Sequence, residues 1–191
     1  MRARFLAAVI AVLLSVGVGQ TLGVEPTAAG LWQAMDDDTH QPNAWFLVRD
    51  HDGIFDGTIV KMYLKPGDSP GATCDGCKDD RRGKPWLGLD IVRGMRREGL
   101  KYKDGTIVDP RNGNVYSAQM TLSADNTTLV VRGYLGISLF GQDKIWTRLP
   151  DSAFNEIDPR FNPNPPPAAP APGRKSGATA KPTPPNGQTT H

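Results

Sequence analysis

Closely spaced turn signals divide residues 30–150 into short segments, and this spacing limits the possible folds more than any other feature of the sequence. The signals are neighbouring pairs of small or polar residues, namely Asp52 with Gly53, Asp56 with Gly57, Asp104 with Gly105, Asn112 with Gly113, and Asp125 with Asn126. Such pairs readily adopt the backbone conformations of tight turns between strands. After the first 23 residues, no window of a dozen residues shows a helical stripe of apolar side chains. The sequence therefore predicts an all-β protein.

The segments between the turns have the two-residue period of strands. In residues 115–122, for example, Tyr116 and Met120 fall on one face and Gln119 falls on the other. The expected strands cover residues 30–35, 45–49, 58–64, 86–93, 100–108, 115–122, 128–135 and 144–149. About eight short strands joined mostly by tight turns favour a closed up-and-down antiparallel β-barrel, because closure removes unpaired strand edges. A two-sheet sandwich is the alternative.

The first and last expected strands carry a possible closure contact. Gly30 and Trp32 open the first strand and Arg148 ends the last. In a closed meander these strands are neighbours, so the Arg148 guanidinium could lie across the Trp32 indole. A cation–π contact of this kind is worth about 1–2 kcal/mol when it is desolvated. The alternative is that Trp32 is an ordinary core aromatic residue.

Both termini differ in composition from the body of the chain. Residues 1–23 combine Arg2 and Arg4 with an apolar run and then small residues, which is the order of a secretory signal peptide; an uncleaved anchor is the alternative. Residues 24–160 are the expected barrel domain, exported to the periplasm or secreted. Residues 161–191 are rich in proline and are expected to be a disordered tail. Without residues 1–23 the basic and acidic residues are equal in number, so no nucleic-acid partner is expected.

The cysteine pair Cys74 and Cys77 is the main candidate for chemistry. In an oxidising compartment a disulfide is the default state of two thiols this close together. A redox-active pair would normally open a helix, and the neighbouring Pro70, Gly71 and Gly76 argue against one. Metal binding would need further ligands from histidines or carboxylates. We therefore expect a structural clasp, with no catalytic residue, no metal and no cofactor.

Six short motifs follow one another along the body of the chain. They are Gly30-x-Trp32, Cys74-x-x-Cys77, Pro85-x-x-Gly88, Asp109-Pro110-x-x-Gly113-x-x-Tyr116, Arg132-Gly133-Tyr134-x-Gly136 and Trp146-x-Arg148. In this order they resemble a bacterial secreted family, the domain-of-unknown-function family numbered 2147, over residues 29–148. The Gly-x-Trp motif with a late Arg is also similar to the signature of lipocalin and related calycin barrels. The resemblance implies an exported lipocalin-like barrel and implies no activity.

Two functions from different classes fit these expectations. The first is binding of a small apolar or amphipathic ligand inside the barrel, since a small barrel has one obvious functional volume. The expected lining residues are Val60, Met62, Leu64, Leu87, Leu89, Ile91, Tyr116, Met120, Leu129 and Val131. The second is an envelope interaction protein that uses its surface loops and tail, with the barrel as scaffold. An interior cavity above roughly 300 Å³ would favour ligand binding, and a solid interior would favour the scaffold.

Overall fold

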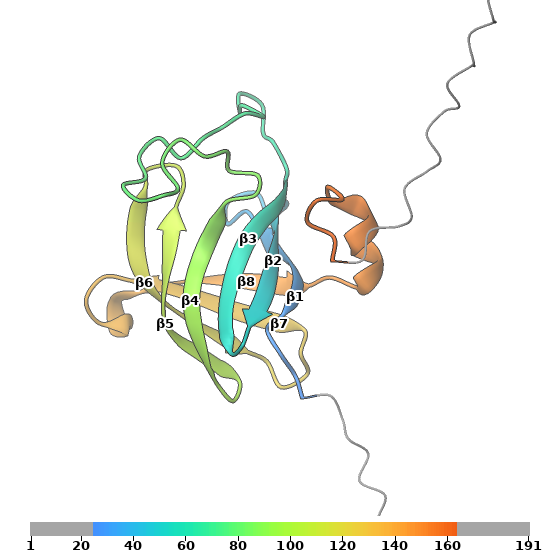
Figure 1. Ribbon diagram of the computed structural model, residues 1–191, viewed down its shortest axis with the longest axis vertical. Helices are drawn as coiled ribbons and strands as arrows, with labels where there is room; N and C mark the ends of the chain where they lie inside the picture. The colour runs from blue at the N-terminus through green and yellow to red at the C-terminus, as the bar shows by residue number, and fades with distance from the viewer. Residues whose placement is uncertain (1–24, 164–191) are drawn as a thin grey trace, which may run out of the picture.

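The computed structural model describes residues 25–163 and contains a single antiparallel sheet closed into a barrel (Figure 1). Its strands are β1 (Gly30–Met35), β2 (Pro42–His51), β3 (Ile54–Met62), β4 (Asp90–Glu98), β5 (Lys101–Asp109), β6 (Asn114–Leu122), β7 (Thr128–Tyr134) and β8 (Gln142–Arg148). Each strand pairs with the next along the chain, and β8 returns to β1. The predicted up-and-down barrel of eight strands is thus confirmed, and the sandwich alternative is excluded.

The closing seam between β1 and β8 is short. It joins Trp32 to Arg148, Gln33 to Thr147 and Ala34 to Trp146. The seam therefore places the first and last strands of the sequence side by side at the position expected from the Gly-x-Trp motif and the late arginine.

Alternate turns lie at opposite ends of the barrel. The turns after β2, β4 and β6 share one end with Trp32 and Arg148, which we call the Trp32 end. The connections after β1, β3, β5 and β7 share the other, which we call the loop end. The connection between β3 and β4, residues 63–89, is by far the longest, and it forms the large green loop of Figure 1. Part of it was predicted as strand, but residues 86–89 form a hydrogen-bonded turn, with the Leu89 amide donating to the Trp86 carbonyl, and β4 begins only at Asp90.

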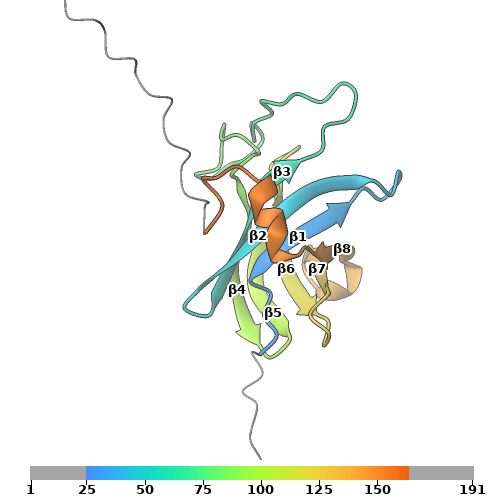
Figure 2. The same cartoon turned by 90° about the vertical axis from the view of Figure 1, so that its right-hand side faces the viewer.

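A short 3-10 helix, η2 (Asp151–Glu156), follows β8 and packs on the outside of the barrel. Figure 2 shows it lying across β1, β2 and β3. An outer apolar cluster joins this helix to the wall, and its buried members are Leu31, Trp45, Leu47, Val60, Ala153 and Ile157. The cluster explains why several positions on the outer face of β1–β3 are apolar.

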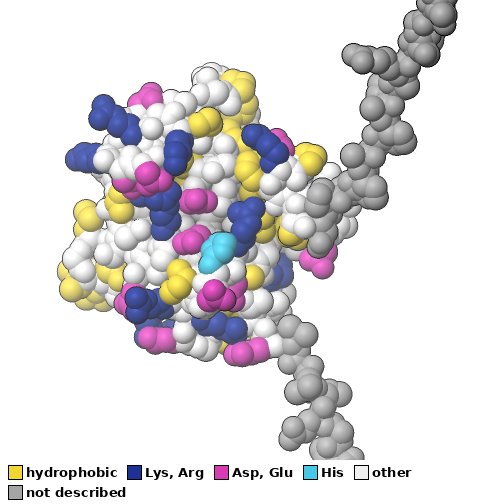
Figure 3. Space-filling model, viewed as in Figure 1, with side chains coloured by type: hydrophobic (Ala, Val, Ile, Leu, Met, Phe, Trp, Pro, Cys, Tyr) yellow, Lys and Arg dark blue, Asp and Glu magenta, His cyan; other side chains and the backbone are white. Residues whose placement is uncertain are grey.

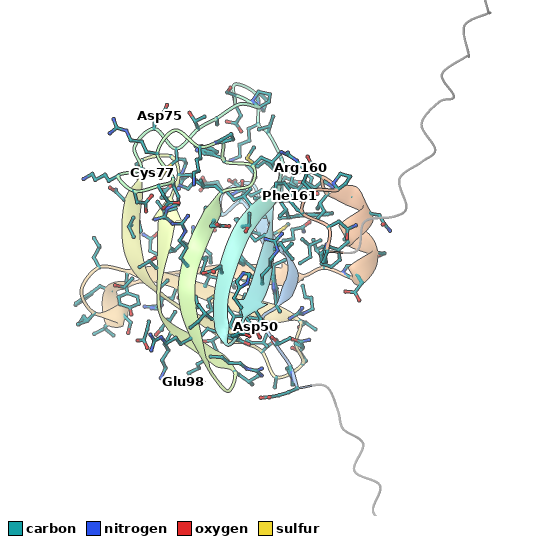
Figure 4. All side chains as sticks on the ribbon, viewed as in Figure 1. Asp50, Asp75, Cys77, Glu98, Arg160 and Phe161 are labelled. Carbon is teal, nitrogen blue, oxygen red and sulfur yellow. A yellow bond between two sulfur atoms is a disulfide. The ribbon has the colours of Figure 1, made fainter. Side chains whose placement is uncertain are left out.

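The domain extends slightly beyond the predicted boundary at residue 160. The ring of Phe161 packs against the outer cluster, and Asn162 is buried, with its side-chain amide donating to the Phe154 carbonyl at 3.0 Å. Figure 4 shows Arg160 and Phe161 next to the barrel wall. The expected signal peptide, residues 1–23, lies outside the described residues, as does the tail from residue 164 onward. Within residues 25–163 there is no helix of the length and apolarity needed to span a membrane.

Candidate functional site

The Trp32 end is closed by the Arg148 side chain. Its guanidinium carbon lies 4.1 Å from the centroid of the Trp32 ring. The same guanidinium donates hydrogen bonds to the backbone carbonyls of Thr27, Ala29 and Asn126. Burial lowers the pKa of Arg148 from its ordinary value, because a charged group is desolvated there. Arg148 thus ties the N-terminal segment, the β6–β7 turn and β8 together, well beyond the single ring contact that the sequence suggested.

A second set of contacts completes this closure. The Trp32 indole nitrogen donates to the Ala28 carbonyl at 2.8 Å, and the Ala28 amide donates to the Tyr102 hydroxyl at 2.8 Å. Tyr102 is fully buried and meets Phe55 edge-on at a centroid distance of 4.7 Å. The buried polar atoms of Trp32, Ala28 and Tyr102 are therefore hydrogen-bonded, and the aromatic rings fill the neighbouring part of the barrel interior.

Side chains occupy the barrel interior. One continuous cluster of buried residues runs through it, including the stacked pair Phe46 and Trp146, whose ring centroids are 4.1 Å apart. Large members that are less than 2 % exposed include Trp32, Phe55, Tyr102, Met95, Met120 and Leu129. With about eight strands a barrel is just narrow enough to be filled in this way. The interior is a packed core in this structure.

The loop end is closed by the segment that carries the two cysteines. Cys74 and Cys77 form a disulfide, with 5.4 Å between their Cα atoms, which confirms the predicted bond. Both residues are buried and belong to the interior cluster, so the bond is also part of the core. Figure 4 places Cys77 and the neighbouring Asp75 above the β5–β6 end of the barrel.

A close backbone approach seats this segment on the β5–β6 turn. A Cβ atom added to Gly113 would lie 2.0 Å from the carbonyl carbon of Gly76, and one added to Gly76 would lie 2.4 Å from the Asn112 carbonyl oxygen. Gly113 also has a φ of +75°, which favours glycine. Both glycines are therefore required for contact between the two loops.

Arg81 fixes the disulfide segment to the start of β4. Its side chain is almost fully buried, donates to the Asp90 carbonyl and pairs with the Asp79 carboxylate at 2.5 Å. The hydrogen bonds from Arg81 lower the pKa of Asp79. The basic and acidic residues of this loop are thus largely engaged with one another.

The predicted ligand-lining residues fall into separate places. Six of them are members of the interior cluster or pack against it, where they contact other side chains; they are Met62, Leu89, Ile91, Met120, Leu129 and Val131. Tyr116 lies at the loop end of β6 and lines a groove that is open to solvent. Leu64 and Leu87 lie in the β3–β4 connection. Together with Val60 and Met62 they line a second open groove, beside η2.

The assignment of Val60 to the interior is wrong. Val60 belongs to the outer cluster under η2, whereas Ile59 belongs to the interior cluster. The cause is a β-bulge, because Trp45 pairs with Lys61 and Phe46 pairs with Ile59, which leaves Val60 as the extra residue. A bulge interrupts the two-residue alternation, so the side of the sheet cannot be counted across it. Leu64 is likewise wrongly placed, since β3 ends at Met62 and Leu64 is 46 % exposed.

The larger groove, of about 500 Å³, lies at the loop end between the disulfide segment, the start of β6 and the end of β7. We call it the Lys78 groove, and it is lined by Lys78, Asp79, Gly113, Asn114, Val115, Tyr116 and Leu135. Val115 and Leu135 are exposed and Tyr116 is half-buried, so the groove has apolar surface facing water. Lys78, Val115 and Leu135 were not predicted as site residues; the run of apolar residues without charge after β7 is the signal that could have indicated Leu135.

The charges of the Lys78 groove do not balance. Asp79 is neutralised by Arg81, and among residues 25–163 the Lys78 ammonium has no ion-pair partner within 4.0 Å. The groove therefore combines apolar walls with an available positive charge.

The groove beside η2, of about 310 Å³, is different. Its lysine, Lys61, lies 3.8 Å from the centroid of the Trp45 ring and pairs with Glu156 at 3.0 Å. Its other acidic residue, Asp158, is held by Arg160, whose hydrogen bonds lower the pKa of that carboxyl. Because each of these charges already has a partner, this groove offers no comparable binding group for a charged ligand. Within residues 25–163, no three His, Cys, Asp or Glu side chains come together as a metal site.

Comparison with known proteins agrees with this architecture. A solved structure described as "Protein HP1028 from the human pathogen Helicobacter pylori belongs to the lipocalin family" superposes with a TM-score of 0.58 and 15% sequence identity, over 69% of this chain and 90% of that chain. At this identity the likeness shows the lipocalin-like fold alone. No curated protein matches the sequence. The model of the family DUF2147, described as an uncharacterized protein conserved in bacteria, matches residues 30–148, which span all eight strands. The chain belongs to the DUF2147 family.

Proposed function

We propose that this protein is an exported barrel that binds a small amphipathic molecule with an anionic head group in the Lys78 groove. The observation that carries the proposal is the presence of an unpaired ammonium beside exposed apolar side chains in one groove. A lipocalin-like barrel has the general capacity to bind small ligands. The proposal moves the site from the interior to the outside of the loop end.

We place the ligand outside the barrel because the interior is packed. Six of the side chains that were expected to line a cavity lie in the interior cluster or pack against it. The Trp32 end is held by Arg148, and the loop end is held by the disulfide segment. A ligand inside the barrel would have to displace buried aromatic rings, and large gaps or displacements in a packed core cost several kcal/mol.

The groove suits an amphipathic anion. The Lys78 ammonium would bind a carboxylate or similar head group, and the apolar chain would cover Val115, Tyr116 and Leu135. Each methylene removed from water contributes about 0.8 kcal/mol, so a chain of moderate length suffices for measurable binding. A charge-assisted contact to Lys78 fixes which end of the ligand faces the disulfide segment.

Export is part of the proposal. It is supported by the signal-like pattern of residues 1–23 and by the disulfide between Cys74 and Cys77, a bond that forms mainly in oxidising compartments. The intact mass of protein from a bacterial periplasmic fraction tests it. A chain that has lost about the first 23 residues and two thiol hydrogens is expected. A full-length, reduced chain in the cytoplasm would contradict export.

Calorimetric titration with dodecanoate below its micelle concentration tests the binding site. Lys78→Gln is expected to weaken binding about tenfold, the loss of one charge-assisted contact. Lys101→Gln is the matched control, because Lys101 is exposed on β5 at the Trp32 end. Dodecanol, which lacks the anionic head, should bind the wild type and the Lys78→Gln variant equally. No binding of dodecanoate, or equal binding by both lysine variants, would refute the proposed site.

A further inference from the structure

The connection between β7 and β8 exposes an unusual amount of apolar surface. Residues 133–142, which we call the hairpin tip, contain the 3-10 helix η1 (Ser138–Phe140) and no charged side chain. Four large apolar residues of the tip are exposed to 69, 59, 75 and 77 %, namely Leu135, Ile137, Leu139 and Phe140. The tip protrudes at the left of Figure 1, and Figure 3 shows hydrophobic side chains gathered there. A contiguous exposed apolar patch on a monomer marks an interaction site.

Several backbone groups of the hairpin tip are hydrogen-bonded within the molecule. The Arg132 guanidinium donates to the Ser138 carbonyl at 2.7 Å and to the Leu139 carbonyl at 3.3 Å. The Gly141 amide donates to Ser138 and the Phe140 amide donates to Ile137. Unpaired peptide groups make it costly to move a loop out of water. These bonds reduce that cost for the tip and hold its side chains outward.

The charged side chains at the base of the hairpin tip form ion pairs. Arg132 pairs with Asp143 at 2.6 Å, and Lys144 pairs with Asp37. These two pairs leave Lys78, which lines a groove together with Leu135, as a nearby cation with no ion-pair partner among residues 25–163. The paired charges contribute little attraction, so the hydrophobic effect supplies most of the binding energy.

We propose that the hairpin tip inserts into the interfacial region of a lipid bilayer. The tip is convex and its four apolar side chains are all well exposed, so a fluid hydrocarbon phase can surround it, whereas a rigid protein partner would need a matching pocket. The absence of charge in residues 133–142 suits the same medium. The inference is independent of the ligand proposal, although Leu135 belongs to both surfaces and insertion would bring the Lys78 groove to the membrane.

Sedimentation of the protein with phosphatidylcholine vesicles tests insertion. The double variant Leu139→Ser with Phe140→Ser should lower the partition coefficient at least about tenfold, because two large apolar side chains leave the lipid. Ile145→Ser is the control, since Ile145 is 63 % exposed but lies on the barrel wall in β8. Neither Leu139 nor Phe140 lines the Lys78 groove, so dodecanoate affinity should not change. This separates failure of insertion from failure of the ligand proposal.

Two further measurements make the result decisive. Raising NaCl with phosphatidylcholine vesicles should leave the partition coefficient nearly unchanged if the hydrophobic effect dominates. Any gain on adding 30% phosphatidylglycerol should be lost in Lys78→Gln, and an equal melting temperature shows that the double variant is folded. Absence of vesicle binding by the wild type, or an equal loss in Ile145→Ser, would overturn the proposal. So would a concentration-dependent dimer that the double variant abolishes, because the tip would then serve a second copy of the chain.

Discussion

The two ends of the barrel are closed by different chemistry. At the Trp32 end, a single cation is held by three backbone carbonyls and a ring. At the loop end, a short disulfide segment sits on a neighbouring turn through glycine contacts and carboxylate–cation pairs. Trp32 is buried in the first closure and the two cysteines are buried in the second, but the first depends mainly on the half-buried Arg148 and the second is shared among several side chains.

This difference bears on function. The Trp32 end lies beside the seam between β1 and β8, the first and last strands, and therefore holds the barrel closed. The loop end carries the Lys78 groove and the hairpin tip, so its surface is available for recognition. Functional residues are found disproportionately on loops that a rigid scaffold positions. We expect changes at the Trp32 end to reduce stability and changes at the loop end to alter binding as well.

The largest effect is expected from Arg148→Ala. It removes a cation–π contact worth about 1–2 kcal/mol and hydrogen bonds to a charged group worth about 1.5–3 kcal/mol, so the free energy of unfolding should fall by about 3 kcal/mol. Urea denaturation measures this. Arg111→Ala, at a side chain that is 76% exposed, should change it by less than about 0.5 kcal/mol. Equal effects of the two substitutions would show that Arg148 does not hold the end closed.

Gly113→Ala should have the next largest effect. The new methyl group would meet the Gly76 backbone, whereas Gly136→Ala has the same left-handed φ, +73°, with no atom within 4 Å. The control should therefore show only the backbone cost of about 1–2 kcal/mol, and Gly113→Ala should lose about 2 kcal/mol more. Thermal unfolding of the two variants gives the difference. If they melt alike, the loops do not depend on their close approach.

Replacing Cys74 and Cys77 together by Ala should cost about 2 kcal/mol, because the loop closed by the bond is very short. The barrel should remain folded, since its strands pair independently of this segment. Trypsin should then cut the β3–β4 connection first, at the exposed Lys78 or Arg82. Urea denaturation and the masses of the fragments test both parts. Complete unfolding, or cleavage that begins in the strands, would contradict a local role for the bond.

The smallest expected effect is the loss of loop-end stability at low pH. Hydrogen bonds from Arg93 and Lys84 hold the pKa of Asp80 well below its usual range, and hydrogen bonds from Arg81 lower the pKa of Asp79. A lowered carboxyl pKa in the folded state stabilises it above the ordinary value of about 3.9, and this stability is lost as the pH falls toward the lowered pKa. Arg148 is held by carbonyls, which do not titrate.

Acid should therefore loosen the loop end first. Amide protection factors measured by NMR from about pH 5 down to about pH 2.5 should fall in residues 74–84 before they fall in β1 and β8. The change should be modest, since these ion pairs are largely exposed. Simultaneous loss at both ends would mean that the closures do not differ in this way.

Features set by residues close together in the sequence could be predicted, and features set by contacts between distant residues could not. Alternation and turn pairs predicted the barrel, because the face of a strand residue follows from its neighbours. Val60 escaped this rule because a bulge depends on the register of the partner strand. The Lys78 groove depends on contact between Gly76 and Gly113, residues far apart in sequence whose approach no local pattern encodes. The cysteine pair predicted a bond but not its burial in the core.

The barrel is packed inside, and we propose that its ligand binds on the outside of the loop end. Intermolecular nuclear Overhauser effects between dodecanoate and the protein's methyl and aromatic protons test it most directly. The account predicts contacts from the ligand chain to Val115, Tyr116 and Leu135, which line the Lys78 groove. Contacts from the chain to Met120, Leu129 or Val131, which are buried in the interior cluster, would instead show that the ligand enters the barrel and would contradict the account.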